Sequence, residues 1–122
     1  MLLCLAGCVT SQKSDVQTVL DNYKTVGFED RISLEEAKVI AQRQLIKKNI
    51  VDLYRLSDPQ VDEDISALPG YEKYWFIYFD EKQPSSIPFI FMVVINKQTG
   101  DIKFADDYNE GNRWILEAAL LH

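Results

Sequence analysis

Side chains that commonly perform catalysis or bind metal ions are scarce in this sequence. It contains one histidine, His122, and two cysteines, Cys4 and Cys8, which both lie near the start. A nucleophile paired with a histidine base, or a zinc site of cysteines and histidines, cannot be assembled from so few groups. No glycine-rich turn is present that could hold a phosphate. We therefore expect a protein that is not an enzyme and has neither a metal site nor a cofactor.

Long hydrophobic runs and an excess of positive charge are also lacking. No apolar run approaches the roughly 18 residues of a membrane-spanning helix. The chain of 122 residues carries a formal net charge of −6, which divides into +1 for residues 9–57 and −7 for residues 58–122. Because an acidic surface repels phosphate backbones, we do not expect nucleic acid as a partner. A basic protein is a better match, although the charge can also serve solubility alone.

The first eight residues have the features of a processing signal. Residues 1–7 are uncharged and mostly apolar, and the chain becomes polar soon after Cys8. The stretch Leu5-Ala6-Gly7-Cys8 resembles the lipobox of bacterial lipoproteins, in which the cysteine is acylated and the peptide is cut before it. This resemblance implies that residues 1–7 are a signal peptide, that Cys8 carries the lipid, and that residues 8–14 form a polar tether.

The lipobox resemblance also implies a location in a bacterial cell envelope, with the membrane bound through the lipid on Cys8. Val9 follows the cysteine, and in enteric-type bacteria the absence of aspartate there favours the outer membrane, facing the periplasm. Since the apolar stretch is short and has no basic start, either the initiation codon lies upstream or the signal is weak. The alternative is an apolar strand that happens to match the motif.

Two amphipathic helices are predicted in the first half of the domain. Apolar residues recur at helical spacing over residues 15–26, and Gly27 can end that helix. Ser33 and Glu36 have the spacing of a capping box that opens a second helix, which Asn49 can terminate. The apolar face of this second helix is predicted to lie across a sheet. It consists of Leu34, Ala37, Ile40, Ala41 and Leu45.

The apolar period changes from 3.6 to 2 after the second helix. Four strands are predicted, at residues 51–56, 74–79, 89–95 and 102–104. Residues 57–70 are predicted to be a loop, and Gly100 to close a hairpin in the left-handed conformation. The pattern predicts an α+β fold in a single domain of residues 15–122. One or two N-terminal helices would pack on a four-stranded antiparallel meander, with a C-terminal helix.

The two central strands are apolar on both sides, so both faces of the sheet need a cover. We predict that residues 111–122 form a C-terminal helix that folds back on the second face, with the first helix as a second candidate. The apolar side of this helix would make the contact through Trp114, Ile115, Ala118, Leu120 and Leu121. The alternative is that part of the second face is exposed and docks a partner.

Residues 32–105 resemble a known type of repeat. The helix sequence ISLEEAKVIAQRQLIKKN, followed by an aromatic strand and by VVINKQTGDIKF, resembles the PepSY-type repeat of secreted bacterial proteins. Similar patterns occur in small cystatin-like or nuclear-transport-factor-like immunity proteins, which neutralise toxins delivered by neighbouring bacteria. The resemblance implies a non-catalytic module that binds or inhibits another protein.

Five acidic residues are the candidate contacts for a basic protein partner: Asp62, Glu63, Asp64, Asp106 and Asp107. Acidic groups on a rigid sheet can steer such a partner and cover its active site. Our first hypothesis is therefore a lipid-anchored protein that binds and inhibits another protein, with immunity to a secreted toxin as one version. The alternative is a structural or assembly lipoprotein of the envelope that uses an apolar surface. A third hypothesis is a hydrophobic ligand carrier, which requires a cavity between helix and sheet.

Overall fold

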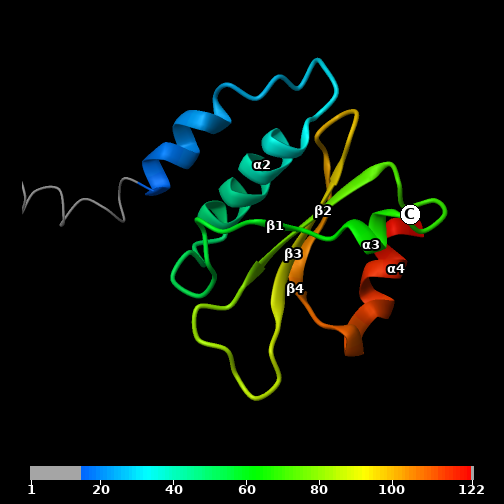
Figure 1. The fold of residues 1–122 in the computed structure, drawn as a ribbon. Coiled ribbons are helices and arrows are strands. Elements are labelled where there is room, and N and C mark those ends of the chain that lie inside the picture. The colour runs from blue at the N-terminus through cyan, green and yellow to red at the C-terminus, as the bar shows by residue number, and fades with distance from the viewer. Residues whose placement is uncertain (1–14, 122) are drawn as a thin grey trace, which may run out of the picture.

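The computed structural model describes residues 15–121 and has an α+β fold, as predicted (Figure 1). The predicted signal peptide, the lipidation site Cys8 and the tether lie outside the described residues. After a first helix over residues 15–23, the elements are α2 (Leu34–Lys47), β1 (Gln60–Val61), α3 (Glu63–Ser66), β2 (Tyr74–Asp80), β3 (Ile90–Asn96), β4 (Ile102–Tyr108), the short 3-10 helix η1 (Glu110–Asn112) and α4 (Arg113–Leu121).

The sheet is an antiparallel meander with the strand order β1-β2-β3-β4. Its first strand was predicted wrongly, because residues 51–56 form turns and a single bridge between Tyr54 and Glu81. The alternation in this segment reflects one-sided burial, since Tyr54 and Leu56 are both buried in the core beneath α2. Strand β1 instead lies within residues 57–70, the segment predicted to be a loop, and pairs with Ile77 and Tyr78.

Strand β4 is longer than the predicted segment of residues 102–104. It reaches Tyr108, and a bulge interrupts its pairing with β3, where Val94 pairs with Phe104 but Ile95 pairs with Ile102. Lys103 is the extra residue at that bulge. The prediction was too short because it relied on apolar content, and the second half of β4 contains polar residues. An outermost strand needs apolar side chains at fewer positions than a central one.

Helix α2 covers one face of the sheet and begins as predicted. The Ser33 hydroxyl accepts from the Glu36 N–H at 3.1 Å, and the Glu36 carboxylate accepts from the Ser33 N–H at 3.0 Å. The same carboxylate accepts from the Gly27 N–H at 2.8 Å, and these backbone hydrogen bonds lower the pKa of Glu36. At the other end, Asn49 takes the left-handed conformation with a φ of 60°. The helix buries Ala37, Ile40, Ala41 and Leu45.

The β3–β4 hairpin is joined to the segment before α2. The Ile32 N–H donates to the Lys97 carbonyl at 2.6 Å, and the Trp75 indole N–H donates to the Ile32 carbonyl at 2.8 Å. Gly100 has a φ of 79°, as predicted, and a Cβ atom there would lie 2.7 Å from the ring of Phe28. Glycine is therefore required both by the turn and by the close approach of this ring.

Helices α3 and α4 cover the second face of the sheet, on the side opposite α2 (Figure 1). The C-terminal helix folds back as predicted, and of its five predicted contact residues Ile115 and Leu120 pack inward while the other three are exposed. Leu116 is buried against the sheet, and Ile115, Ala119 and Leu120 pack around it, whereas Trp114 and Leu121 are exposed. The first helix lies on the α2 side, where Val19 joins the core, so it does not cover the second face.

The orientation of α4 follows from the turn that precedes it. In η1 the side chain of Asn109 accepts from the Asn112 N–H at 3.1 Å, and the Asn112 side chain accepts from the Asn109 N–H at 2.8 Å. This reciprocal cap sets the direction in which the chain leaves β4 and enters the helix. Arg113 and Glu117 lie one turn apart and mark the exposed side of α4. Trp114 and Leu121 lie on that same side, whereas Leu116 is buried.

Candidate binding sites

The predicted acidic residues Asp62, Glu63 and Asp64 lie at the outer edge of β1. Asp62 is the N-cap of α3, where its carboxylate accepts from the Ile65 N–H at 3.1 Å. Glu63 and Asp64 occupy the first turn of this short helix and are exposed. Acidic groups are favourable at that end of a helix because its N–H groups are unpaired. Asp62 therefore has a structural role, and Glu63 and Asp64 point to solvent.

Asp106 and Asp107 lie on β4, the outermost strand at the other edge of the sheet. The Tyr54 hydroxyl donates to the Asp107 carboxylate, and burial, followed by this hydrogen bond, raises the pKa of Tyr54. The Asp106 carboxylate accepts from the Asp107 N–H at 2.8 Å. Charged side chains at an outermost strand discourage the pairing of a second chain. Both carboxylates therefore already form hydrogen bonds within the domain.

The structure does not bring the two acidic groups together. They belong to opposite edges of a four-stranded sheet, and three strand spacings of about 4.8 Å separate those edges by roughly 14 Å. Asp106 and Asp107 are also successive residues of one strand, so their side chains point to opposite faces. A single flat partner surface cannot easily contact all five carboxylates at once.

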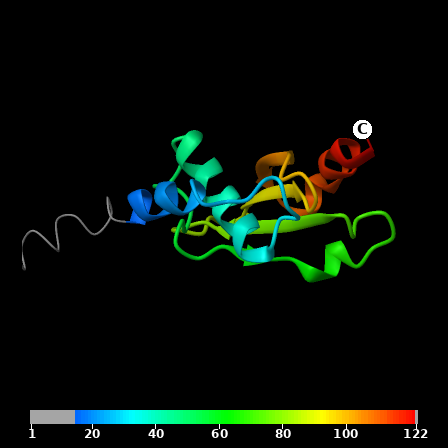
Figure 2. The same ribbon diagram turned by 90° about the horizontal axis from the view of Figure 1, so that it is seen from above.

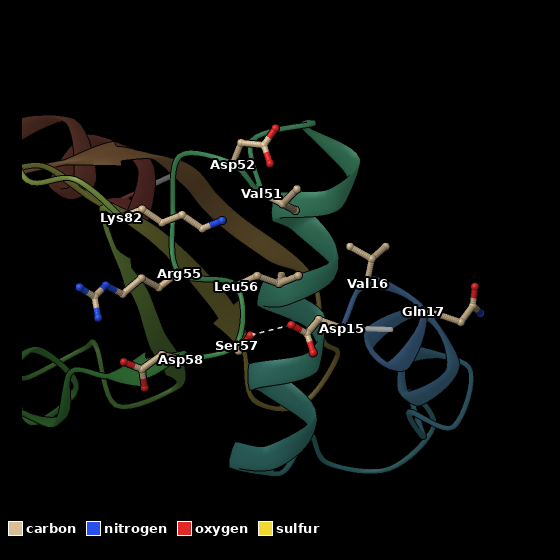
Figure 3. A pocket seen from close by; sticks show the side chains of 10 residues that line it. All are labelled: Asp15, Val16, Gln17, Val51, Asp52, Arg55, Leu56, Ser57, Asp58 and Lys82. Atoms are coloured by element: carbon tan, nitrogen blue, oxygen red, sulfur yellow. Dashed lines mark hydrogen bonds between the residues drawn. The ribbon is translucent and has the colours of Figure 1, made fainter. Parts of the chain in front are cut away.

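One hollow on the surface of the described residues was not predicted. It lies between the start of the first helix and the segment after α2, and has a volume of about 610 Å³ (Figure 3). We call it the N-terminal groove. It is lined by Asp15, Val16, Gln17, Val51, Asp52, Arg55, Leu56, Ser57, Asp58 and Lys82. The core between α2 and the sheet is filled by buried side chains, so this hollow differs from the cavity that the third hypothesis required.

The second candidate is the outward side of α4. Trp114 is 67 % exposed and Leu121 is 80 % exposed, and Ala118 between them is also exposed. These residues have the spacing i, i+4 and i+7, so they form one stripe along the helix, which we call the outer stripe of α4. The neighbouring Leu68 is 45 % exposed and, with Arg113 and Glu117, lines a small hollow of about 40 Å³ between α3 and α4.

Beneath α4, the hydroxyl of Tyr108 is buried and has no hydrogen-bond partner among the described residues. Arg113 lies near this hydroxyl, and the interaction is the main cause of the raised pKa of Arg113. The two groups are close, but they are not aligned for a hydrogen bond. The pair of Tyr108 and Arg113 is thus a polar contact at the start of α4.

In comparisons with protein-family models, curated proteins and solved structures, no match to this chain is found. Within residues 15–121, no group of three or more acidic, cysteine or histidine side chains could hold a metal ion. None of the helices in that range has the length and apolar character needed to cross a bilayer. The lipobox and the PepSY resemblance remain predictions.

The two sites differ in how far the sequence could reveal them. The N-terminal groove joins residues 15–17, 51–58 and Lys82, and no pattern links segments so far apart in the chain. For α4 a signal was present, because seven of its nine residues are apolar, which is more than a single contact buries. That excess could have indicated a second, exposed stripe.

Proposed function

We propose that this chain is a lipid-anchored protein of a bacterial cell envelope whose domain binds another protein without catalysing a reaction. The single observation that carries the binding proposal is the outer stripe of α4, where Trp114 and Leu121 are 67 % and 80 % exposed. Exposed apolar side chains that form a continuous stripe commonly mark an interaction surface. Tryptophan is also the residue type most enriched among the residues that dominate binding energy.

The position of α4 agrees with this proposal. Seen from above, the first helix begins at one end of the molecule and α4 lies at the other (Figure 2). A lipid on Cys8 would hold the end that carries the first helix near the membrane. The outer stripe of α4 would then face away from the bilayer, where a second protein can reach it.

The proposed anchor can be tested in a bacterial host. Cells that produce the chain are grown with a clickable fatty acid, and the chain is then examined for label, with Cys8→Ser as the matched control. We expect label on the native chain alone. Equal labelling of both chains, or none on either, would contradict the anchor.

The binding surface can be tested by photo-crosslinking in the same host. A photoreactive benzoylphenylalanine replaces Trp114 in one variant and Lys24 in a control, because Lys24 is exposed and distant from α4. We expect one discrete adduct from position 114 only, and its loss when Leu121→Lys is added. Adducts from position 24 alone, or from neither position, would overturn the proposal.

The salt dependence of binding distinguishes between the two kinds of partner. An envelope assembly held by the outer stripe of α4 should resist high salt, because apolar contacts are not screened. Inhibition of a basic toxin remains the second candidate, and the exposed carboxylates of Glu63 and Asp64 favour it. In that case charge reversal at both residues should slow association and reduce its salt dependence.

A further inference from the structure

The N-terminal groove has a volume and an apolar lining that are typical of a ligand site. Its volume of about 610 Å³ lies within the range of roughly 300–1,000 Å³ that is typical of small-molecule pockets. Three apolar side chains line it, of which Leu56 is buried while Val16 and Val51 are half-buried at the edge of the core. In Figure 3, Leu56 extends toward the first helix and Val16. An apolar chain could therefore lie along this lining.

Charges of both signs surround the apolar lining. Arg55 and Lys82 supply positive charge, and Asp15, Asp52 and Asp58 supply negative charge. Among the described residues, the ion pairs are Lys24 with Asp21 and Lys38 with Glu35, so Arg55 and Lys82 have no carboxylate partner there. Figure 3 shows the Lys82 ammonium group directed toward the middle of the groove, while Arg55 extends outward at its rim.

The two cationic residues are held in place by backbone pairing. The Arg55 N–H donates to the Asp80 carbonyl, and the Lys82 N–H donates to the Leu53 carbonyl, both at 3.0 Å. These bonds flank the bridge between Tyr54 and Glu81. Residues on either side of such a bridge place their side chains on the same face. The side chains of Arg55 and Lys82 therefore lie on the same side of this strand pair.

The carboxylates come from two segments. Asp15 belongs to the first helix, and Asp52 and Asp58 belong to the segment that also carries Arg55. Asp15 accepts from the Ser57 hydroxyl at 3.5 Å across the groove, and Asp58 accepts from the Gln60 amide at 2.7 Å. These hydrogen bonds orient both groups but leave their negative charge in place. A ligand of one sign would be attracted by the groups of opposite charge and repelled by the others, whereas a ligand with both signs can match both.

We propose that the N-terminal groove binds a zwitterionic amphiphile, with an anionic group on Lys82, an ammonium group on the carboxylates, and an apolar chain over Val16, Val51 and Leu56. A zwitterionic phospholipid or its single-chain derivative has this chemistry. The inference goes beyond the proposed function and does not depend on α4. The proposed anchor would favour it, because residues 8–14 span at most roughly 25 Å and would keep the groove close to lipid headgroups.

The proposal can be tested with four single-chain probes that share an octyl chain and differ in the head group. These are octylphosphocholine, octyl sulfate, octyltrimethylammonium and octyl glucoside, each used below its micelle concentration and followed by amide chemical shifts of residues 15–121. We expect saturable binding of octylphosphocholine, with the shifts concentrated at groove residues. Its affinity should exceed that of the other three probes by roughly tenfold, as expected for charge-assisted contacts.

Two variants and a matched control locate the site. Lys82→Glu should weaken octylphosphocholine binding by roughly tenfold, because it removes the charge directed into the groove. Ser57→Trp fills the groove from an exposed position and should abolish binding, whereas Lys24→Glu makes the same charge change as Lys82→Glu outside the groove and should change affinity by less than about twofold.

Three outcomes would overturn the inference. Equal affinity for all four probes would mean that only the chain is recognised, and a preference for a singly charged probe would mean that groups of one charge act alone. The absence of saturable shifts at the groove would mean that no amphiphile binds there. Retained amide spectra in the variants show that their folds are intact, so a loss of binding is not caused by unfolding.

Discussion

Helices α2 and α4 lie on opposite faces of the same sheet, yet they differ in how their apolar residues are used. Helix α2 has 14 residues and buries four of them, while its exposed positions carry polar residues such as Glu35 and Lys47. Helix α4 has nine residues and fully buries one, Leu116, while its outer stripe remains apolar. The two helices therefore differ both in length and in the share of their apolar residues that is buried.

The difference indicates that α2 mainly stabilises the core, whereas α4 has an apolar surface that the core does not bury. A helix that only completes a core has polar residues on its outer side, as α2 does. The apolar outer stripe of α4 contributes nothing to the packing described here. We therefore expect substitutions on the α2 side to act mainly on stability, and those on the outer stripe of α4 to act mainly on binding.

The largest effect is expected for Leu45→Ala. Leu45 is 0 % exposed and lies in the larger of the two apolar clusters, so its truncation should lower the free energy of unfolding by about 3–5 kcal/mol. Urea unfolding followed by circular dichroism measures this. The neighbouring exposed Lys47→Ala should cost less than about 0.5 kcal/mol. A loss below about 1 kcal/mol at Leu45 would contradict the packing of α2.

A smaller loss is expected for Leu116→Ala on the other face. Its truncation should cost about 2–3 kcal/mol, because α4 is short and can separate from the sheet without unfolding the rest. Hydrogen exchange should accordingly show weaker protection of amides in α4 than in α2. The comparison between the two helices fails if Leu116→Ala costs more than Leu45→Ala.

The cap of α2 should make an intermediate contribution. Ser33→Ala should lower stability by about 1 kcal/mol, because it leaves the Glu36 N–H without its acceptor. The folded state lowers the pKa of Glu36 from its ordinary value of 4.5. The stabilisation from this carboxylate is therefore present above pH 4.5 and is lost as the pH falls through the lowered pKa.

Unfolding of the native chain and of Glu36→Gln, measured at neutral pH and in acid, tests this pH dependence. The native chain should be the more stable at neutral pH, and the difference should shrink in acid. An equal difference at both pH values would show that the charge of Glu36 does not contribute.

The smallest effect on stability is expected at the outer stripe of α4. The double substitution Trp114→Lys with Leu121→Lys should change the unfolding free energy by less than about 0.5 kcal/mol per site. On the same helix, Leu116→Lys should cost several kcal/mol, because it would bury an unpaired charge. Thermal unfolding compares the two variants. A large loss from the outer substitutions would mean that the stripe is part of the core and not a binding surface.

Sequence patterns predicted most of the fold where the signal is local. The capping box at Ser33, the end of α2 before Asn49, the left-handed Gly100 and the two central strands depend on neighbours in the chain, and all are confirmed. The position of the first strand was wrong, since burial of Tyr54 in the core imitates strand alternation. Helix α3 has four residues, and so short a segment has no measurable period.

The candidate sites were predicted less well than the fold. The five acidic residues were predicted as contacts for one partner, but strand order places them at two opposite edges of the sheet. Trp114 was predicted to face the sheet and is exposed instead. The N-terminal groove depends on residues from three separate segments, and the sequence has no feature that relates them.

By itself, the sequence determined the identity of the main elements, their caps and the need for a cover on both faces of the sheet. These follow from side-chain periodicity and from hydrogen bonds within a few residues of each other. Only the tertiary structure decided which acidic residues are neighbours and where a groove opens. Those outcomes depend on strand order and on the angle at which distant segments meet, and no short stretch of the chain encodes either.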